Sequence, residues 1–168
     1  MSRYTSESGW DATDELIAVS NQLKHADSLQ EAFEKYLVTR EQAFPEVAYY
    51  AKHGEWRTEQ TVAAADLDDP FSAKPHECYY NAQTSFGPDT QYVEGYAIHY
   101  TKQAAIPHAW LERDEVILEL TPSLDHTVST YYGVAFDHVD VTHALIEREH
   151  ASPIVEAAVV GLFADADE

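Results

Sequence analysis

Basic residues are scarce in this chain, which also has one cysteine and no long apolar run. Five lysines and five arginines stand against thirty aspartates and glutamates, so the net charge is −20 over 168 residues. So few cations leave no basic patch that could face phosphates, and we expect no nucleic-acid partner. The longest apolar stretch, near 157–163, is too short to cross a bilayer, so we expect no membrane partner.

The low number of cysteines and of basic residues also indicates in which cellular compartment the protein is found. One cysteine cannot form an internal disulfide, which agrees with a reducing interior. The first residues contain no apolar segment of the kind that a signal peptide needs, and we expect a cytoplasmic protein. A surface this acidic repels itself at low salt and is screened at high salt, which is typical of proteins from a salt-rich cytoplasm.

The apolar content, in contrast, is that of a globular protein. Hydrophobic residues make up 45% of the chain, including eleven tyrosines, six phenylalanines and three tryptophans. This is enough for one continuous core, so we expect a single domain over 1–168, with residues 1–10 frayed.

The spacing of the apolar residues predicts helices, then strands, then helices. The expected helices are 11–26, one that begins after Asp27 or Ser28, 41–53 with a break near Pro45, one from Asp137 or Asp140 to Glu149, and a last one capped by Ser152-Pro153. The expected strands are 91–100, 105–112, 115–120 and 130–136. Residues 55–67 show no clear pattern. This order predicts an α+β fold in which N-terminal helices pack on a small antiparallel sheet and further helices follow.

Cys78 stands where a cysteine is reactive. The segment from His76 to Ala82 is typical of the opening turn of a helix, and the positive end of a helix dipole favours a thiolate. A lone cysteine in a small domain is, however, often an inert buried thiol. Its role therefore depends on the groups around it.

A histidine and a glutamate on two later strands supply such groups. If Arg113-Asp114 is a two-residue turn, Glu112 pairs with Glu115, and His108 then lies directly opposite Glu119 on the same face. A thiol, an imidazole and a carboxylate in this arrangement provide a nucleophile, a base and a group that orients the base.

These pieces resemble the transglutaminase-like branch of the papain-like cysteine peptidase superfamily. The matching segments, in chain order, are Cys78-Tyr79, Gly95-Tyr96-Ala97, His108-Ala109-Trp110-Leu111-Glu112 and Glu119-Leu120-Thr121-Pro122. The resemblance covers residues 75–136 and implies a papain-like core. It also implies a cysteine amide hydrolase or acyl transferase that acts on a peptide or amide substrate, and we expect no cofactor.

The resemblance also implies roles for individual residues. Cys78, His108 and Glu119 are the expected catalytic residues, while Tyr79, Tyr96 and Trp110 either line the substrate site or pack in the core. The family usually has Asp as its third member, so Asp114 and Asp125 remain alternatives to Glu119. The expected oxyanion donor is the backbone N–H of Cys78, with the side-chain amides of Asn81 and Gln83 as further candidates.

Two other interpretations use the same residues. His76, Cys78, His99 and His108 are of the types that bind zinc, but the His76-x-Cys78 spacing is not a common zinc motif and there is no second cysteine, so we expect no metal. The chain could also be a non-catalytic interaction or assembly domain of the same fold, because a fold alone implies no activity.

Overall fold

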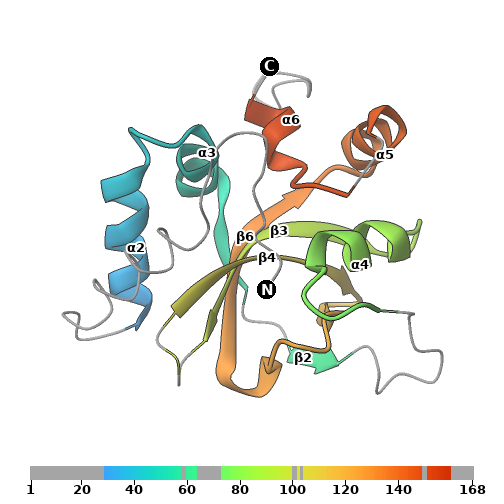
Figure 1. Ribbon diagram of the computed structural model, residues 1–168, viewed down its shortest axis with the longest axis horizontal. Coiled ribbons are helices and arrows are strands. Elements are labelled where there is room, and N and C mark those ends of the chain that lie inside the picture. The colour runs from blue at the N-terminus through green and yellow to red at the C-terminus, as the bar shows by residue number, and fades with distance from the viewer. Residues whose placement is uncertain are drawn as a thin grey trace.

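The computed structural model describes residues 29–57, 60–63, 73–99, 102, 104–148 and 151–159, and these form a mixed α+β fold. Helices pack over one face of a curled six-stranded sheet (Figure 1). The expected helix over 11–26 and the expected fraying of residues 1–10 lie outside the described residues.

The sheet has the strand order β1-β6-β3-β4-β5-β2. Its strands are β1 (Glu55–Arg57), β2 (Gln60–Ala63), β3 (Gln91–His99), β4 (Ala104–Arg113), β5 (Val116–Glu119) and β6 (Ser129–Phe136). The four predicted strands are therefore present, but two edge strands come from the segment that showed no pattern. The predicted antiparallel pairing is present in β1–β6, β6–β3, β3–β4 and β4–β5, and it is wrong at one edge, where β2 pairs with β5 in parallel. A three- or four-residue edge strand is too short to produce a recognisable alternation.

The helices begin and end largely where local signals place them. They are α2 (Leu29–Arg40), α3 (Pro45–His53), α4 (Cys78–Ser85), α5 (His138–Glu147) and α6 (Val155–Val159). Pro45 occupies the first turn of α3, where a missing N–H does no harm, and α3 ends at Gly54. At the start of α5, the Asp137 carboxylate accepts the Val139 N–H at 2.8 Å.

The start of α6 corrects one prediction. Ser152-Pro153 does not cap this helix: the Ser152 side chain and carbonyl accept hydrogen bonds from Arg148 instead. The buried carboxylate of Glu94, from the middle of β3, accepts the N–H groups of Ile154 and Val155. A residue sixty positions away in the sequence thus provides the cap that a local pattern assigned to Ser152.

The two faces of the sheet carry different cores. The largest side chains of the helix-side core are aromatic: Phe33, Tyr36, Tyr50, Tyr92, Tyr96, Tyr132 and Phe136. The opposite face holds a smaller group, the Trp110 cluster, which consists of Val93, Ala97, Trp110, Ile117 and Tyr131. Gly133 makes room for this cluster, because a Cβ at that position would lie 2.7 Å from the Trp110 ring.

The turn between β4 and β5 lies one residue later than predicted. Its central residues are Asp114 and Glu115, with φ values of 52° and 61°, and Arg113 pairs with Val116. Positive φ at both central positions matches the right-handed twist of the flanking strands. The register is therefore shifted by two residues from the predicted one, and Glu119 is a diagonal neighbour of His108 rather than its direct partner.

We expect Glu115→Gly to stabilise the protein. Glu115 adopts a left-handed conformation that glycine accepts without a steric penalty, so the gain should be about 0.5–1 kcal/mol. Urea unfolding at fixed pH and salt measures it as a shift in the midpoint. Glu115→Ala is the matched control, because it removes the same side chain yet keeps the Cβ; an equal gain from Ala would show that backbone strain is not the cause.

Candidate active site

Cys78 is the first residue of α4 and is half-buried. The helix starts there because the chain makes a sharp turn just before it: His76 has a positive φ of 61°, and its N–H donates to Ser123 Oγ at 3.0 Å. Asn81 fixes the same turn, since its side-chain amide exchanges two 2.8 Å hydrogen bonds with the backbone of Lys74. As the first helical residue, Cys78 has a backbone N–H with no acceptor inside the helix.

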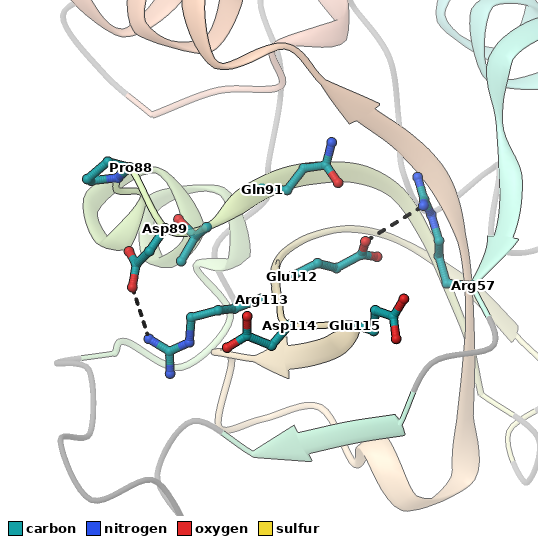
Figure 2. A pocket seen from close by; sticks show the side chains of 9 residues that line it. Arg57, Pro88, Asp89, Gln91, Glu112, Arg113, Asp114 and Glu115 are labelled. Atoms are coloured by element: carbon teal, nitrogen blue, oxygen red, sulfur yellow. Dashed lines mark hydrogen bonds and ion pairs between the residues drawn. The ribbon is translucent and has the colours of Figure 1, made fainter.

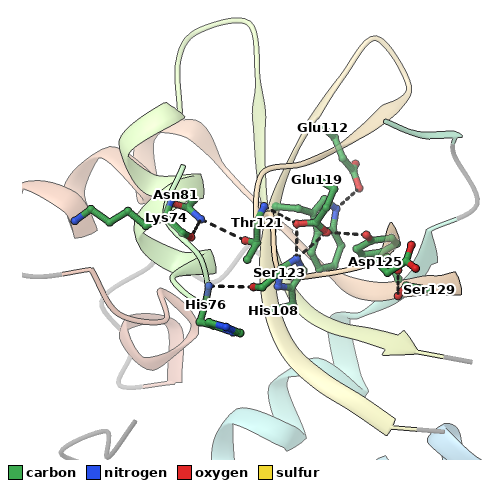
Figure 3. A network of polar contacts seen from close by, with 12 residues as sticks. Lys74, His76, Asn81, His108, Glu112, Glu119, Thr121, Ser123, Asp125 and Ser129 are labelled. Atoms are coloured by element: carbon green, nitrogen blue, oxygen red, sulfur yellow. Dashed lines mark hydrogen bonds and ion pairs between the residues drawn. The ribbon is translucent and has the colours of Figure 1, made fainter. Parts of the chain in front are cut away.

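His108 and Glu119 meet on the face of the sheet that carries the Trp110 cluster (Figure 3). His108 Nε2 lies 3.0 Å from Oε1 and 2.9 Å from Oε2 of Glu119, and both side chains are almost completely buried. The predicted contact is present although the predicted register was wrong. A shift of two residues keeps a side chain on its face, and the long Glu side chain covers the diagonal distance.

Cys78 completes the constellation, because its thiol lies close enough to His108 to raise the pKa of the imidazole. Nε2 faces Glu119, so Nδ1 is the ring nitrogen left for the thiol. Burial lowers the pKa of His108, but the charge of Glu119 and the interactions with Cys78 and Glu119 outweigh burial and raise the pKa to about 10. His108 is therefore an imidazolium at neutral pH.

The Glu119 carboxylate is held by two further donors. The Tyr131 hydroxyl donates to Oε2 at 2.7 Å, and the backbone N–H of Thr121 donates to Oε1 at 2.9 Å. Sequence reasoning missed Tyr131 as part of the site. Its alternation within a predicted strand showed which residues share its face, but no local signal shows that β6 and β5 bring these two side chains together.

The other predicted site residues lie in different surroundings. Tyr96 is 2% exposed in the helix-side core, on the face opposite His108, and Tyr79 is half-buried against the same core. Trp110 is fully buried beside His108, with ring centroids 6.1 Å apart. The structure thus places Trp110 next to His108, whereas Tyr96 lies on the other face of the sheet and does not reach His108.

The alternative carboxylates and amides have other partners. Asp114 lies in the β4–β5 turn, and Asp125 accepts the N–H and hydroxyl of Thr127. Asn81 is occupied by Lys74, and the Gln83 amide donates to Tyr92 Oη and to the Ser152 carbonyl. The side-chain amides of Asn81 and Gln83 are therefore used in structural hydrogen bonds. The backbone N–H of Cys78 remains as the candidate donor to an oxyanion.

A cavity of about 440 Å³ lies at the C-terminal end of β4, next to the β4–β5 turn (Figure 2). Figure 2 shows that Glu112 faces Arg57 on one side and that Arg113 faces Asp89 on the other. The two ion pairs measure 3.7 Å and 3.5 Å. Trp110 Nε1 donates to Glu112 at 3.0 Å, so one indole separates this cavity from His108. Cys78, His108 and Glu119 do not line this cavity, whereas Asp114, the alternative to Glu119, does.

Across the part of the chain that the structure describes, no three His, Cys, Asp or Glu side chains are arranged to hold a metal ion. Within the same residues, no helix is both long and apolar enough to cross a bilayer. Comparisons with protein-family models, curated proteins and solved structures found no match. What the site does therefore has to follow from its own geometry.

Proposed function

We propose that this protein is a cysteine-nucleophile amide hydrolase or acyl transferase that acts through Cys78, His108 and Glu119. The observation that carries the proposal is the buried His108–Glu119 pair next to a thiol at a helix N-terminus, a thiol that acts on the pKa of His108. An imidazolium held between a thiol and a carboxylate matches a catalytic relay better than a structural histidine, which needs no third partner. The order of helix, strand and strand is also that of a papain-like core.

The proposed reaction begins with the thiolate of Cys78, whose proton resides on His108. Sγ attacks the carbonyl carbon of an amide, and the Cys78 N–H donates to the oxyanion that forms. The C–N bond then breaks, His108 gives its proton to the leaving amine, and a thioester remains on Cys78.

The second half of the reaction releases the acyl group. Water or an amine attacks the thioester carbon and gives a proton to His108, and the C–S bond breaks. Water as acceptor gives hydrolysis, while an amine gives acyl transfer. Glu119 keeps its negative charge throughout, holding the imidazole orientation and stabilising the imidazolium.

Alkylation by iodoacetamide tests the proposal, since Cys78 is the only thiol in the chain. The reagent is uncharged, so the protein's net charge of −20 does not repel it. We expect the native protein to be alkylated already at about pH 6, where an ordinary thiol is almost entirely protonated. The alkylation rate should also change near pH 10, because the pKa of His108 is about 10 and the imidazolium loses its proton there.

The same protein in urea is the matched control, because unfolding removes His108 from the thiol. Mass spectrometry gives both rates, and incubation with an activated ester should add one acyl group to native Cys78. A native thiol that reacts no faster than the unfolded one at about pH 6 would contradict the proposal. That result would favour the non-catalytic interaction domain.

A further inference from the structure

We propose that Tyr131 is a positioning residue that fixes the Glu119 carboxylate against His108. The inference rests on the proposed function and adds a fourth member to its relay. Tyr131 is 1% exposed and therefore does not touch a substrate. Its place in the site comes from β6, where it pairs with Ala97 of β3 and lies on the same face as His108.

The need for such a residue follows from the length of Glu119. Glutamate has one more rotatable bond than aspartate, and a free carboxylate could turn away from the imidazole. Here each oxygen has a second donor: Oε1 accepts from Thr121 N–H, and Oε2 accepts from Tyr131 O–H. With both oxygens fixed, the carboxylate presents its two acceptors to His108 Nε2 at nearly equal distances.

The surroundings hold Tyr131 in this position. Its ring packs against the Trp110 ring, with centroids 5.1 Å apart, and Trp110 in turn lies nearly parallel to His108 at an interplanar angle of 20°. Gly133 leaves the space that the indole occupies. Tyr131 therefore cannot move without disturbing Trp110. Burial and the neighbouring Glu119 charge raise the pKa of Tyr131, so its hydroxyl remains a donor over the working range of pH.

Tyr131→Phe tests this role, and Tyr132→Phe is the matched control. Tyr132 is the next residue, is also buried, and loses a comparable hydrogen bond, from its hydroxyl to the Tyr50 carbonyl at 2.9 Å. The readout is the downfield proton NMR signal of the His108 Nε2–H that donates to Glu119. We expect Tyr131→Phe to broaden this signal and speed its exchange with water, and Tyr132→Phe to leave it unchanged.

Alkylation provides a second readout. We expect Cys78 in Tyr131→Phe to react roughly tenfold more slowly at about pH 6, the scale of one charge-assisted hydrogen bond, with no change in Tyr132→Phe. An unchanged His108 signal in folded Tyr131→Phe would overturn the inference. The NMR comparison does not require a reactive thiol, so failure of the proposed function would appear separately, as an inert Cys78 beside an intact His108 signal.

A wild-type measurement covers the case in which Tyr131→Phe does not fold. The Tyr131 O–H and the His108 Nε2–H point at the same carboxylate, so they should show cross-relaxation in the native protein. A Tyr131 hydroxyl that exchanges rapidly with water and shows no such cross-peak would also overturn the inference.

Discussion

Replacing Cys78 with alanine should abolish acyl-enzyme formation and any hydrolysis or acyl transfer, because the chain has no other thiol to take its place. The fold should be retained, since Cys78 is half-buried at the end of a helix and alanine is an excellent helix residue. Mass spectrometry after incubation with an activated ester measures acylation, and circular dichroism checks the fold. Acylation that persists in Cys78→Ala would assign the nucleophile to another side chain.

Variants of His108 and Glu119, the two partners of Cys78, should lower the rate of acylation to different extents. His108→Ala removes the proton carrier and should slow acylation by about 10³-fold or more. Glu119→Gln should cost at least about 100-fold, because the neutral amide no longer stabilises the imidazolium. The fold should survive Glu119→Gln, since the Gln carbonyl can accept the Thr121 N–H while its amide faces the Tyr131 hydroxyl oxygen.

Comparison with a distant carboxylate separates this effect from a change in net charge. Glu41 is exposed on the surface, so Glu41→Gln removes one negative charge without touching the triad. We expect Glu41→Gln to be acylated at the wild-type rate. A rate for Glu119→Gln that matches it would show that Glu119 takes no part in the chemistry.

The second large effect concerns Glu94 and stability at different pH values. Burial raises the pKa of Glu94 from 4.5 to about 7, although hydrogen bonds from Tyr92, Ile154 and Val155 act in the opposite direction. The folded state therefore holds this proton more tightly than the unfolded state does. The resulting stabilisation is fully present below about pH 4.5 and is lost as the pH rises through about 7.

The rise in the Glu94 pKa from 4.5 to about 7 corresponds to a change of up to about 3 kcal/mol in the free energy of unfolding. Other carboxylates titrate over the same range, so the difference in unfolding free energy between wild type and Glu94→Gln isolates this residue. We expect wild type to lose stability relative to Glu94→Gln as the pH rises, whereas Glu41→Gln should follow the wild-type curve. Urea unfolding at pH values on both sides of this range measures the three curves. A wild-type to Glu94→Gln difference that stays constant would show that Glu94 has the same pKa in the folded and unfolded protein.

The sequence by itself determined the elements that depend on neighbouring residues. Pro45 and Gly54 set the bounds of α3, Asp137 begins α5, and the segment around Cys78 begins α4. These features depend on φ preferences and on capping, which act within a few positions. The alternation along β4 and β5 also placed His108 and Glu119 on one face, and an error of two residues in register cannot change the face.

Only the tertiary structure decided which distant groups meet. The actual turn at Asp114-Glu115, the parallel β2–β5 pair, the Tyr131 hydroxyl on Glu119 and the Glu94 cap on α6 all depend on how strands pair across the sheet. Strand pairing is governed by the fit of whole faces, so a residue's own neighbours in the chain do not encode its partner. The three residues of the proposed triad could therefore be predicted from the sequence. The Tyr131 and Thr121 donors that hold the Glu119 carboxylate could not.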